Sequence, residues 1–428
     1  MNLKYLNNVL ALDNLSQEFK DFKQNVLEKD TLCISLNAGE RAHLTAGLNT
    51  KTIYVAKDSY SALMAYQKLK TYEESAVLLQ PNDDLLFFRK SFQKSLSGDR
   101  VKALYAFASN QSKILVTSPL ALVQFLPKKK RLLKSVTTIK VNDEIDIYAL
   151  IDRLIELGYT REEACEEKNT FSSHGDILDV FLSYMTMPIR ISFFGDTIEN
   201  IKTFDVETML SLGALDEVTL YPNNDLLYEP QEIEKAISMA QKEISKMPLE
   251  ASQRANQILS DLASIPNCTQ QHQWLIPFIS KFNDTIFDYL DDGIMVLDEV
   301  DGIKGLLSNH LKEHMARISE LYQKGEITKS HVLSIMNEEE MQQRLDGVLK
   351  LGFSNLATSA TILKPKQIIK INSKRLNNYI LHYDKLISDL DLYLRNGLMV
   401  VLCQATKDRA KALYNSLIDQ DIPCVYKE

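Results

Sequence analysis

The sequence predicts an α/β fold with a second, antiparallel α+β unit built into it. Three observations support this class. Short apolar runs rich in β-branched residues alternate with helical segments in residues 1–127. A two-residue turn, Gly195-Asp196, joins two strand-like runs further along the chain. Strand-like and helical runs alternate again after residue 366.

The first segment, residues 1–127, alternates in the way that a parallel sheet with crossover helices requires. Its apolar runs have strand length, and the segment after the second run has apolar residues at helical spacing. The expected elements are strands at Thr31–Leu36, Thr52–Ala56, Ser75–Leu79 and Ser112–Val116, and a helix at Ser59–Thr71. We take this segment as the first half of the main domain.

Residues 128–222 follow a different pattern. A predicted helix ends at Gly158, and strand-like runs follow it on both sides of the Gly195-Asp196 turn. Glycine readily adopts the positive φ that a two-residue hairpin turn requires. The expected elements are a helix at Tyr148–Leu157 and strands at Asp176–Phe181, Ile189–Phe194 and Thr197–Thr203. This pattern predicts an inserted α+β domain with an antiparallel sheet.

Residues 223–365 are mostly helical, apart from a strand-like GIMVLDEV at 293–300, and we assign them to the second half of the main domain. Residues 366–428 predict a small α/β domain. Its expected strands are Ile368–Ile371, Leu398–Cys403 and Pro423–Tyr426. Because the last strand ends with the chain, we expect the sheet to continue in a longer protein.

Length, net charge and composition exclude several classes of protein. A chain of 428 residues predicts two to three domains of about 150 residues. The net charge of −8 argues against a protein that coats DNA, because phosphate binding requires a basic face. No apolar run approaches the ~18 residues of a membrane span, and the N-terminus lacks a signal-peptide pattern. The cysteines are scattered and indicate a reducing cytoplasm, without a metal site or disulfide framework; they are Cys33, Cys165, Cys268, Cys403 and Cys424.

A phosphate-binding loop is expected where the first strand meets a helix, in ISLNAGERAHLTAGL at 34–48. The pattern requires glycine, four residues, then Gly-Lys-Ser/Thr. Ser35, Glu40, Arg41 and Ala42 occupy those four positions. Glu40 would place a negative charge at the β-phosphate, and Ala42 has no hydroxyl for magnesium. We therefore interpret the loop as a degenerate nucleotide site that binds no cofactor, and we expect no catalytic residue in the chain.

Three further motifs were weighed. Asp298 and Glu299 end a hydrophobic strand, as does the acidic pair of a nucleotide-driven motor, but without a working phosphate loop the pattern favours a surface turn or helix N-terminus. His310 and His314 fit the H-x-x-E-H zinc pattern, but they lie in an amphipathic helix with polar neighbours. The basic run Lys128–Lys134 is either a solvated linker or a phosphate-contacting patch.

The strand PIRISFF at 188–194 carries the most informative pattern. A period of two places Ile189, Ile191 and Phe193 on one apolar face, and Arg190 and Phe194 on the other. An aromatic residue beside an arginine on an otherwise polar face is typical of an interaction hot spot. The alternative is that Phe194 packs under a neighbouring helix.

The segment that contains this strand, FSSHGDILDVF…MPIRISFFGDTIENIKTFDVET at 171–208, closely resembles a module shared by two bacterial repair families. These are the excision-repair helicase subunit UvrB and the transcription-repair coupling factors. The eroded phosphate loop favours the second family. The segments LLQPNDDLLFFRKSF…SGDRVKALYAFASNQSKILVTSPLALVQFLP (78–127) and FDYLDDGIMVLDEVDGI (287–303) also resemble the N-terminal region of that family.

The resemblance implies a UvrB-like domain, split by an inserted domain that docks the repair ATPase UvrA, followed by a small α/β domain of unclear role. The family's docking positions correspond to Arg190, Phe194 and His174, where His174 replaces the usual arginine. A neutral imidazole cannot reproduce the bidentate contact of an arginine, so this contact is the weakest. Asn169 replaces a usual glycine, and asparagine tolerates the left-handed backbone that the turn requires.

The sequence therefore predicts a cytoplasmic recognition platform that presents a UvrB-like surface to UvrA and is not itself an enzyme. The resemblance implies that the intact protein recruits repair to stalled RNA polymerase, and that its ATP- and magnesium-dependent motor, its polymerase contacts and its DNA contacts lie outside this sequence. The main alternative is a nucleotide-dependent helicase core, and a further alternative is a DNA-binding module that uses Lys128–Lys134.

Overall fold

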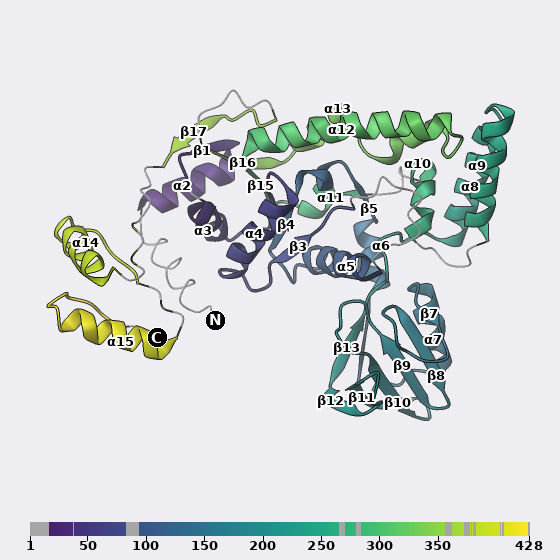
Figure 1. Ribbon diagram of the computed structural model, residues 1–428, viewed down its shortest axis with the longest axis horizontal. Helices are drawn as coiled ribbons and strands as arrows, with labels where there is room; N and C mark the ends of the chain where they lie inside the picture. Colours follow the sequence, from purple (N-terminus) through teal and green to yellow (C-terminus); the bar gives the residue numbers. More distant parts are fainter. Residues whose placement is uncertain are drawn as a thin grey trace.

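The computed structural model describes residues 17–36, 38–82, 94–264, 270–279, 284–355, 362–371, 382–402 and 406–426, with residues 377, 379 and 404 (Figure 1). Part of the 78–127 segment used for the family resemblance lies outside these residues, as do Cys268 and Cys403. The fold is mixed α/β, with one parallel sheet and separate antiparallel sheets, so the coarse fold class is confirmed.

The main sheet has seven parallel strands in the order β17-β1-β16-β15-β2-β4-β3. These strands come from residues 31–117 and from residues 294–370, on the two sides of a long intervening segment. Their bounds are β1 Thr31–Ile34, β2 Thr52–Val55, β3 Val77–Leu79, β4 Ile114–Thr117, β15 Ile294–Asp298, β16 Leu349–Ser354 and β17 Gln367–Lys370.

Both faces of this sheet are buried at its central strands, whereas the edge strand β17 has one exposed face. Successive residues of one strand enter opposite cores: Leu32 packs in one apolar cluster and Cys33 in the other, and Ile53 and Tyr54 divide in the same way. A parallel sheet covered by helices on both faces explains why its strands appear in the sequence as continuous apolar runs. The covering helices are α2 Gln17–Glu28, α3 Ala38–Leu48, α4 Ser59–Lys70, α5 Lys94–Ala108, α12 Val300–Gln323 and α13 Glu338–Asp346.

The α+β unit, residues 137–220, hangs below the main sheet in Figure 1. It contains a six-stranded sheet in the order β12-β11-β10-β9-β8-β7, antiparallel except between β7 and β8. Gly195 turns between β10 and β11 with a φ of 59°, as the hairpin pattern predicted. The bounds are β7 Thr160–Arg161, β8 Thr170–His174, β9 Ile177–Phe181, β10 Ile189–Phe194, β11 Thr197–Phe204 and β12 Ser211–Leu215.

One face of this sheet is covered by α7 (Ile147–Glu156), whose Leu150, Ile151 and Leu154 join the core of the unit. Strands β6 (Thr137–Lys140) and β13 (Glu217–Leu220) pair antiparallel where the chain enters and leaves the unit. The entry helix α6 (Lys129–Ser135) connects the unit to the main sheet.

The long helix α12 extends from the main sheet to a helical region built around the buried Trp274. That region contains α8 Pro230–Ile244, α9 Leu249–Ala263, η2 Gln270–Leu275, α10 Ile276–Ile279 and η4 Lys329–Ser334. The remaining elements are η1 Pro119–Leu122, the paired β5 Phe125–Leu126 and β14 Asp284–Thr285, and α11 Ile286–Leu290.

The C-terminal segment differs from the prediction. The strand expected to open a small α/β domain at 366–428 is β17, which instead pairs with β1 at the edge of the main sheet. The described residues 398–402 and 423–426 form no strand, and the segment contributes helices α14 (Tyr383–Arg395) and α15 (Lys407–Ile418) around a small apolar cluster. A strand requires a partner for its backbone groups, and the apolar run at 398–402 has none within the described part of this segment.

Candidate functional site

The six-stranded sheet has a buried face and an outer face, and β10 contributes to both. Ile189, Ile191 and Phe193 are at most 5% exposed and lie in the core of the unit, as the period-two pattern predicted. Arg190 and Phe194 therefore belong to the outer face. The structure thus places two of the three expected docking residues on one strand and one face.

Phe194 is 80% exposed, more than any other large aromatic side chain among the described residues. It directly precedes the Gly195 turn, where it pairs with Thr197 across the hairpin. No neighbouring helix covers the ring, so the alternative in which Phe194 packs inside the protein is wrong. Because the hairpin holds the phenyl ring in water, a partner can bury the ring without breaking contacts inside this protein.

Arg190 is held rigidly on the same face. Its Nε and Nη2 donate to Oδ1 and Oδ2 of Asp179 on β9, at 2.8 and 2.7 Å. Its guanidinium lies 4.7 Å above the ring centroid of Phe204, a distance at which a cation–π contact is favourable. The hydrogen bonds that Arg190 donates to Asp179 raise the pKa of Arg190. The side chain keeps 25% of its surface exposed, so a fixed cation faces solvent four residues before Phe194 on the same strand.

His174 lies at the end of β8 on the same outer face. It pairs with Ile177, which pairs with Ser192 between Arg190 and Phe194. Directly opposite residues of antiparallel strands share a face. His174 is exposed, and its Nε2 lies 3.2 Å from the backbone oxygen of Glu163. The three expected docking residues are thus brought to one face of one sheet.

A second site lies where β1 meets α3, at the expected nucleotide position. Ser35 turns the chain with a φ of 69°, and α3 begins at Ala38. Arg41 is 3% exposed, and its Nη1 donates to Asp298 Oδ1 at 2.5 Å and to Glu299 Oε1 at 2.6 Å. The acidic pair that ends β15 is therefore occupied by an arginine of the same chain.

Every nitrogen of the Arg41 guanidinium is engaged. Nε donates to the backbone oxygen of Leu36 at 3.1 Å, and Nη2 donates to Asn355 Oδ1 at 2.9 Å. Tyr54 donates to the second oxygen of Asp298 at 2.6 Å. Burial alone would lower the pKa of Arg41, and the charges and hydrogen bonds of the acidic pair more than offset that effect. The result is a closed polar network in which Arg41 is permanently cationic.

Comparisons with known proteins found similarity to one domain profile and to one group of curated proteins. The profile of the UvrB interaction domain matches residues 137–226, which include the α+β unit and its outer face. The transcription-repair-coupling factor of Bacillus subtilis (strain 168) is 22% identical over 434 residues, covering 97% of this chain. That of Staphylococcus aureus (strain bovine RF122 / ET3-1) is 23% identical over 423 residues, covering 96%.

This chain is similar to the N-terminal region of the transcription-repair coupling factors. It spans about a third of the length of these curated relatives, 37% and 36% respectively. The similarity extends over nearly the whole chain, so the main sheet and the α+β unit both fall within it.

The other expected motifs are structural in this fold. His314 of the H-x-x-E-H pattern is 2% exposed, and burial together with the nearby His310 lowers its pKa to about 4. No group of three potential metal ligands occurs in the described ranges. In the basic run, Lys129 pairs with Asp291 at 2.5 Å, and Arg131 pairs with Glu232 at 2.7 Å. These pairings favour a structural connection over a phosphate-contacting patch.

The residues that support the two sites were not predicted from the sequence. Asp179 and Phe204 orient Arg190, and Tyr54 and Asn355 complete the Arg41 network. Asp179 carried a detectable signal, because a carboxylate inside the apolar strand ILDVF requires a partner when it is buried. In the described residues no helix has both the length and the apolar character to cross a membrane.

Proposed function

We propose that this chain is a protein-docking platform that recruits UvrA through the outer face of its α+β unit. The exposed phenyl ring of Phe194 beside the fixed guanidinium of Arg190, inside the segment that matches the UvrB interaction domain, is the observation that carries the proposal. Aromatic and arginine side chains dominate binding hot spots because they combine apolar area with directed hydrogen bonds.

The two residues have different tasks at this face. Phe194 provides buried area, since 80% of its surface is available to a partner. Arg190 provides orientation, because its two bonds to Asp179 fix the plane of the guanidinium before a partner arrives. Preorganisation reduces the entropy lost on binding. His174 adds a third, weaker contact at the far strand, since neutral imidazole lacks the fork of an arginine.

In this proposal, the nucleotide-like site binds no nucleotide. An active site would hold magnesium against an acidic pair such as Asp298 and Glu299, and phosphate against the loop. Here Arg41 supplies the positive charge from within the protein. A nucleotide would have to break a buried ion pair before its metal could bind. We therefore propose that the chain itself hydrolyses no ATP, and the helicase alternative is disfavoured.

In the longer protein, this platform would be joined to a motor that consumes ATP and magnesium and to surfaces for RNA polymerase and DNA. Its role would be to present a UvrB-like surface in the cytoplasm and so bring excision repair to a stalled polymerase. The domains we propose are a main domain divided into 1–127 and 223–365, which gains β17, and the unit at 128–222 inserted in it.

Isothermal titration calorimetry with UvrA of the same organism tests the docking face. Phe194→Ala should weaken binding by at least tenfold. Tyr148→Ala is the matched control, because Tyr148 is 72% exposed in the same unit but lies on α7, which covers the opposite face of the sheet. Equal affinities for wild type and Phe194→Ala would rule out the face. Micromolar ATP binding by the wild type would instead support the helicase alternative.

A further inference from the structure

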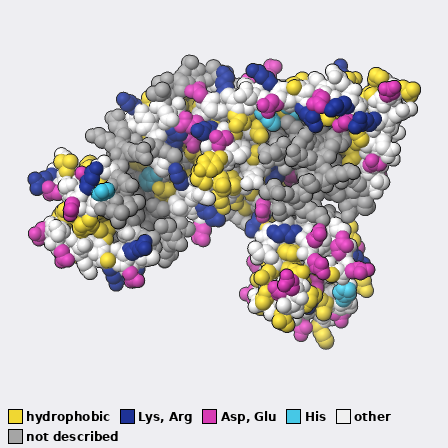
Figure 2. All heavy atoms as spheres, viewed as in Figure 1, with side chains coloured by type: hydrophobic (Ala, Val, Ile, Leu, Met, Phe, Trp, Pro, Cys, Tyr) yellow, Lys and Arg dark blue, Asp and Glu magenta, His cyan; other side chains and the backbone are white. Residues whose placement is uncertain are grey.

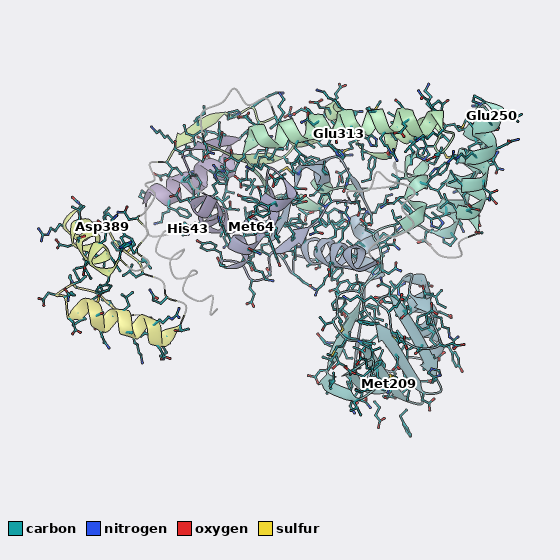
Figure 3. All side chains as sticks on the ribbon, in the orientation of Figure 1. His43, Met64, Met209, Glu250, Glu313 and Asp389 are labelled. Carbon is teal, nitrogen blue, oxygen red and sulfur yellow. The ribbon has the colours of Figure 1, made fainter. Side chains whose placement is uncertain are left out.

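The strand β12, Ser211–Leu215, forms one edge of the six-stranded sheet, and no strand in the described part of the chain pairs with its outer side. Four of its five residues are exposed, and Leu212 is 57% exposed. The loop that leads into it is also apolar and exposed, with Met209 at 49% and Leu210 at 66%. Figure 3 shows Met209 at the lower end of the α+β unit, away from the main sheet.

Natural sheets protect their edges with charged residues, proline, bulges or very short strands. The opposite edge of this sheet is protected in that way, because β7 has only two residues and one of them is Arg161. Strand β12 has the sequence SLGAL and contains no charged residue and no proline. Its pairing with β11 skips Leu212, so the irregularity lies at the start of the strand, and residues 213–215 pair in regular register. Its small side chains leave the outer backbone groups accessible, which is the condition for adding another strand.

The charges around this edge have one sign. Residues 205–217, DVETMLSLGALDE, contain four acidic residues and no basic one. Glu217 is paired with Lys140 at 2.8 Å. Asp205, Glu207 and Asp216 remain at the two ends of the strand, and Lys202 lies opposite Ala214 on the neighbouring β11. Figure 2 shows acidic and hydrophobic side chains together over much of the lower part of this unit.

We infer that β12 is a strand-addition site for an extended segment of another protein that is apolar at alternate positions and basic at both ends. The apolar alternate residues would pack against Leu212 and Ala214, which are both exposed. The basic ends would lie near the acidic residues that bracket the strand. This edge borders the same outer face as Arg190 and Phe194, because Arg190 pairs with Lys202 and Lys202 pairs with Ala214. Strand addition would use the free backbone of β12 and not those two side chains, so the inference does not depend on the identity of their partner.

A second copy of this chain is the competing occupant, and the charges argue against it. Antiparallel pairing of two β12 strands would place 213 opposite 213, and so would bring the acidic ends of two chains together. Each chain also carries a net charge of −8. Like charges directly opposite each other destabilise strand pairs, whereas lysine or arginine at those positions stabilises them.

Fluorescence anisotropy with the full chain tests the site. The probe is a labelled synthetic peptide of alternating valine and threonine with two lysines at each end, and its control has glutamates in place of the lysines. The lysine peptide should bind at least tenfold more tightly than the glutamate peptide. Leu212→Lys should weaken that binding by at least tenfold. Leu249→Lys is the matched control, since Leu249 is 74% exposed on α9 and lies outside the α+β unit.

Hydrogen exchange and sedimentation complete the test. The lysine peptide should slow amide exchange within 211–215, because added strands hydrogen-bond to the free backbone groups. Equal affinity for the two peptides, or unchanged exchange at these amides, would overturn the inference. A wild-type dimer in analytical ultracentrifugation that Leu212→Lys dissociates would also overturn it, since a second copy would then be the occupant.

Discussion

Replacing Arg41 with alanine tests most directly the proposal that the Arg41 network stabilises the fold and that the nucleotide-like site binds no nucleotide. The substitution removes a guanidinium whose side chain is 4% exposed and leaves two carboxylates close together at the end of β15. Asp298 is 12% exposed and keeps only the hydroxyl of Tyr54, while Glu299 is 28% exposed and can rotate toward water. Most of the lost stability should therefore come from the unpaired carboxylate of Asp298.

The magnitude follows from this burial. Removing one partner of a buried ion pair costs about 3–5 kcal/mol, because the other charge remains desolvated. The partial exposure of Glu299 favours the lower half of that range. Urea denaturation at pH 7 should therefore give an unfolding free energy about 3 kcal/mol below that of the wild type. Arg395→Ala is the control, since Arg395 pairs with Asp391 at an exposed helical surface and such pairs contribute about 0.5 kcal/mol.

Two further outcomes separate this reasoning from a functional nucleotide site. Arg41→Met with Asp298→Asn should restore much of the lost stability, since the charge of the more buried carboxylate, Asp298, is removed together with its partner. Arg41→Ala should gain no ATP affinity, because Glu40 and Ala42 still lack the required chemistry. A loss below about 1 kcal/mol in Arg41→Ala would mean that the network is not a stabilising element. ATP binding by that variant would mean that Arg41 alone prevents nucleotide binding at this site.

Two shorter predictions concern stability elsewhere. Arg190→Ala should lower the unfolding free energy by about 2 kcal/mol because it strips the hydrogen bonds from the buried Asp179, whereas Phe194→Ala should change it by less than about 0.5 kcal/mol. Equal losses in urea melts would contradict the division of tasks at the docking face. The buried His314 has a folded-state pKa of about 4, below its unfolded value near 6.5. The unfolded state therefore binds the proton first, so the unfolding free energy is unaffected by His314 above pH 6.5 and decreases as the pH falls toward 4. That loss amounts to at most about 3 kcal/mol, and His314→Leu should flatten the decline, while a slope unchanged by His314→Leu would assign it to other groups.

Local chemistry predicted much of the fold. Six of the seven main-sheet strands were predicted, because apolar, β-branched runs suit a doubly covered sheet. Strand β16 was not, because its sequence LKLGFS contains no β-branched residue and lies in a segment that was expected to be mostly helical. The hairpin followed from Gly195, and the two faces of β10 followed from its alternation. Asn169, expected to tolerate a left-handed turn, has a φ of 67°. Each of these features is decided within a few residues of sequence.

Features decided by distant partners were not predictable. The ion pair of Arg41 joins residues 257 positions apart, and nothing near Arg41 in the sequence indicates the partner. Strand β17 was assigned to the wrong domain because its pairing with β1 depends on where the main sheet ends. Strand β12 was missed because glycine, alanine and serine have weak strand propensity and β11 imposes the conformation.

The closed network at Arg41 constrains how a docking platform of this kind could be controlled. A nucleotide-driven protein changes state because its metal and phosphates leave after hydrolysis. A covalently attached guanidinium cannot leave, so Asp298 and Glu299 would not be switched by release of a ligand as the acidic pair of a nucleotide site is. The outer face is preformed, because Arg190 is fixed by Asp179 and Phe194 stands on a tight hairpin. In the proposed docking role, covering Phe194 would turn docking off. Control of docking would then lie in whatever competes for that ring.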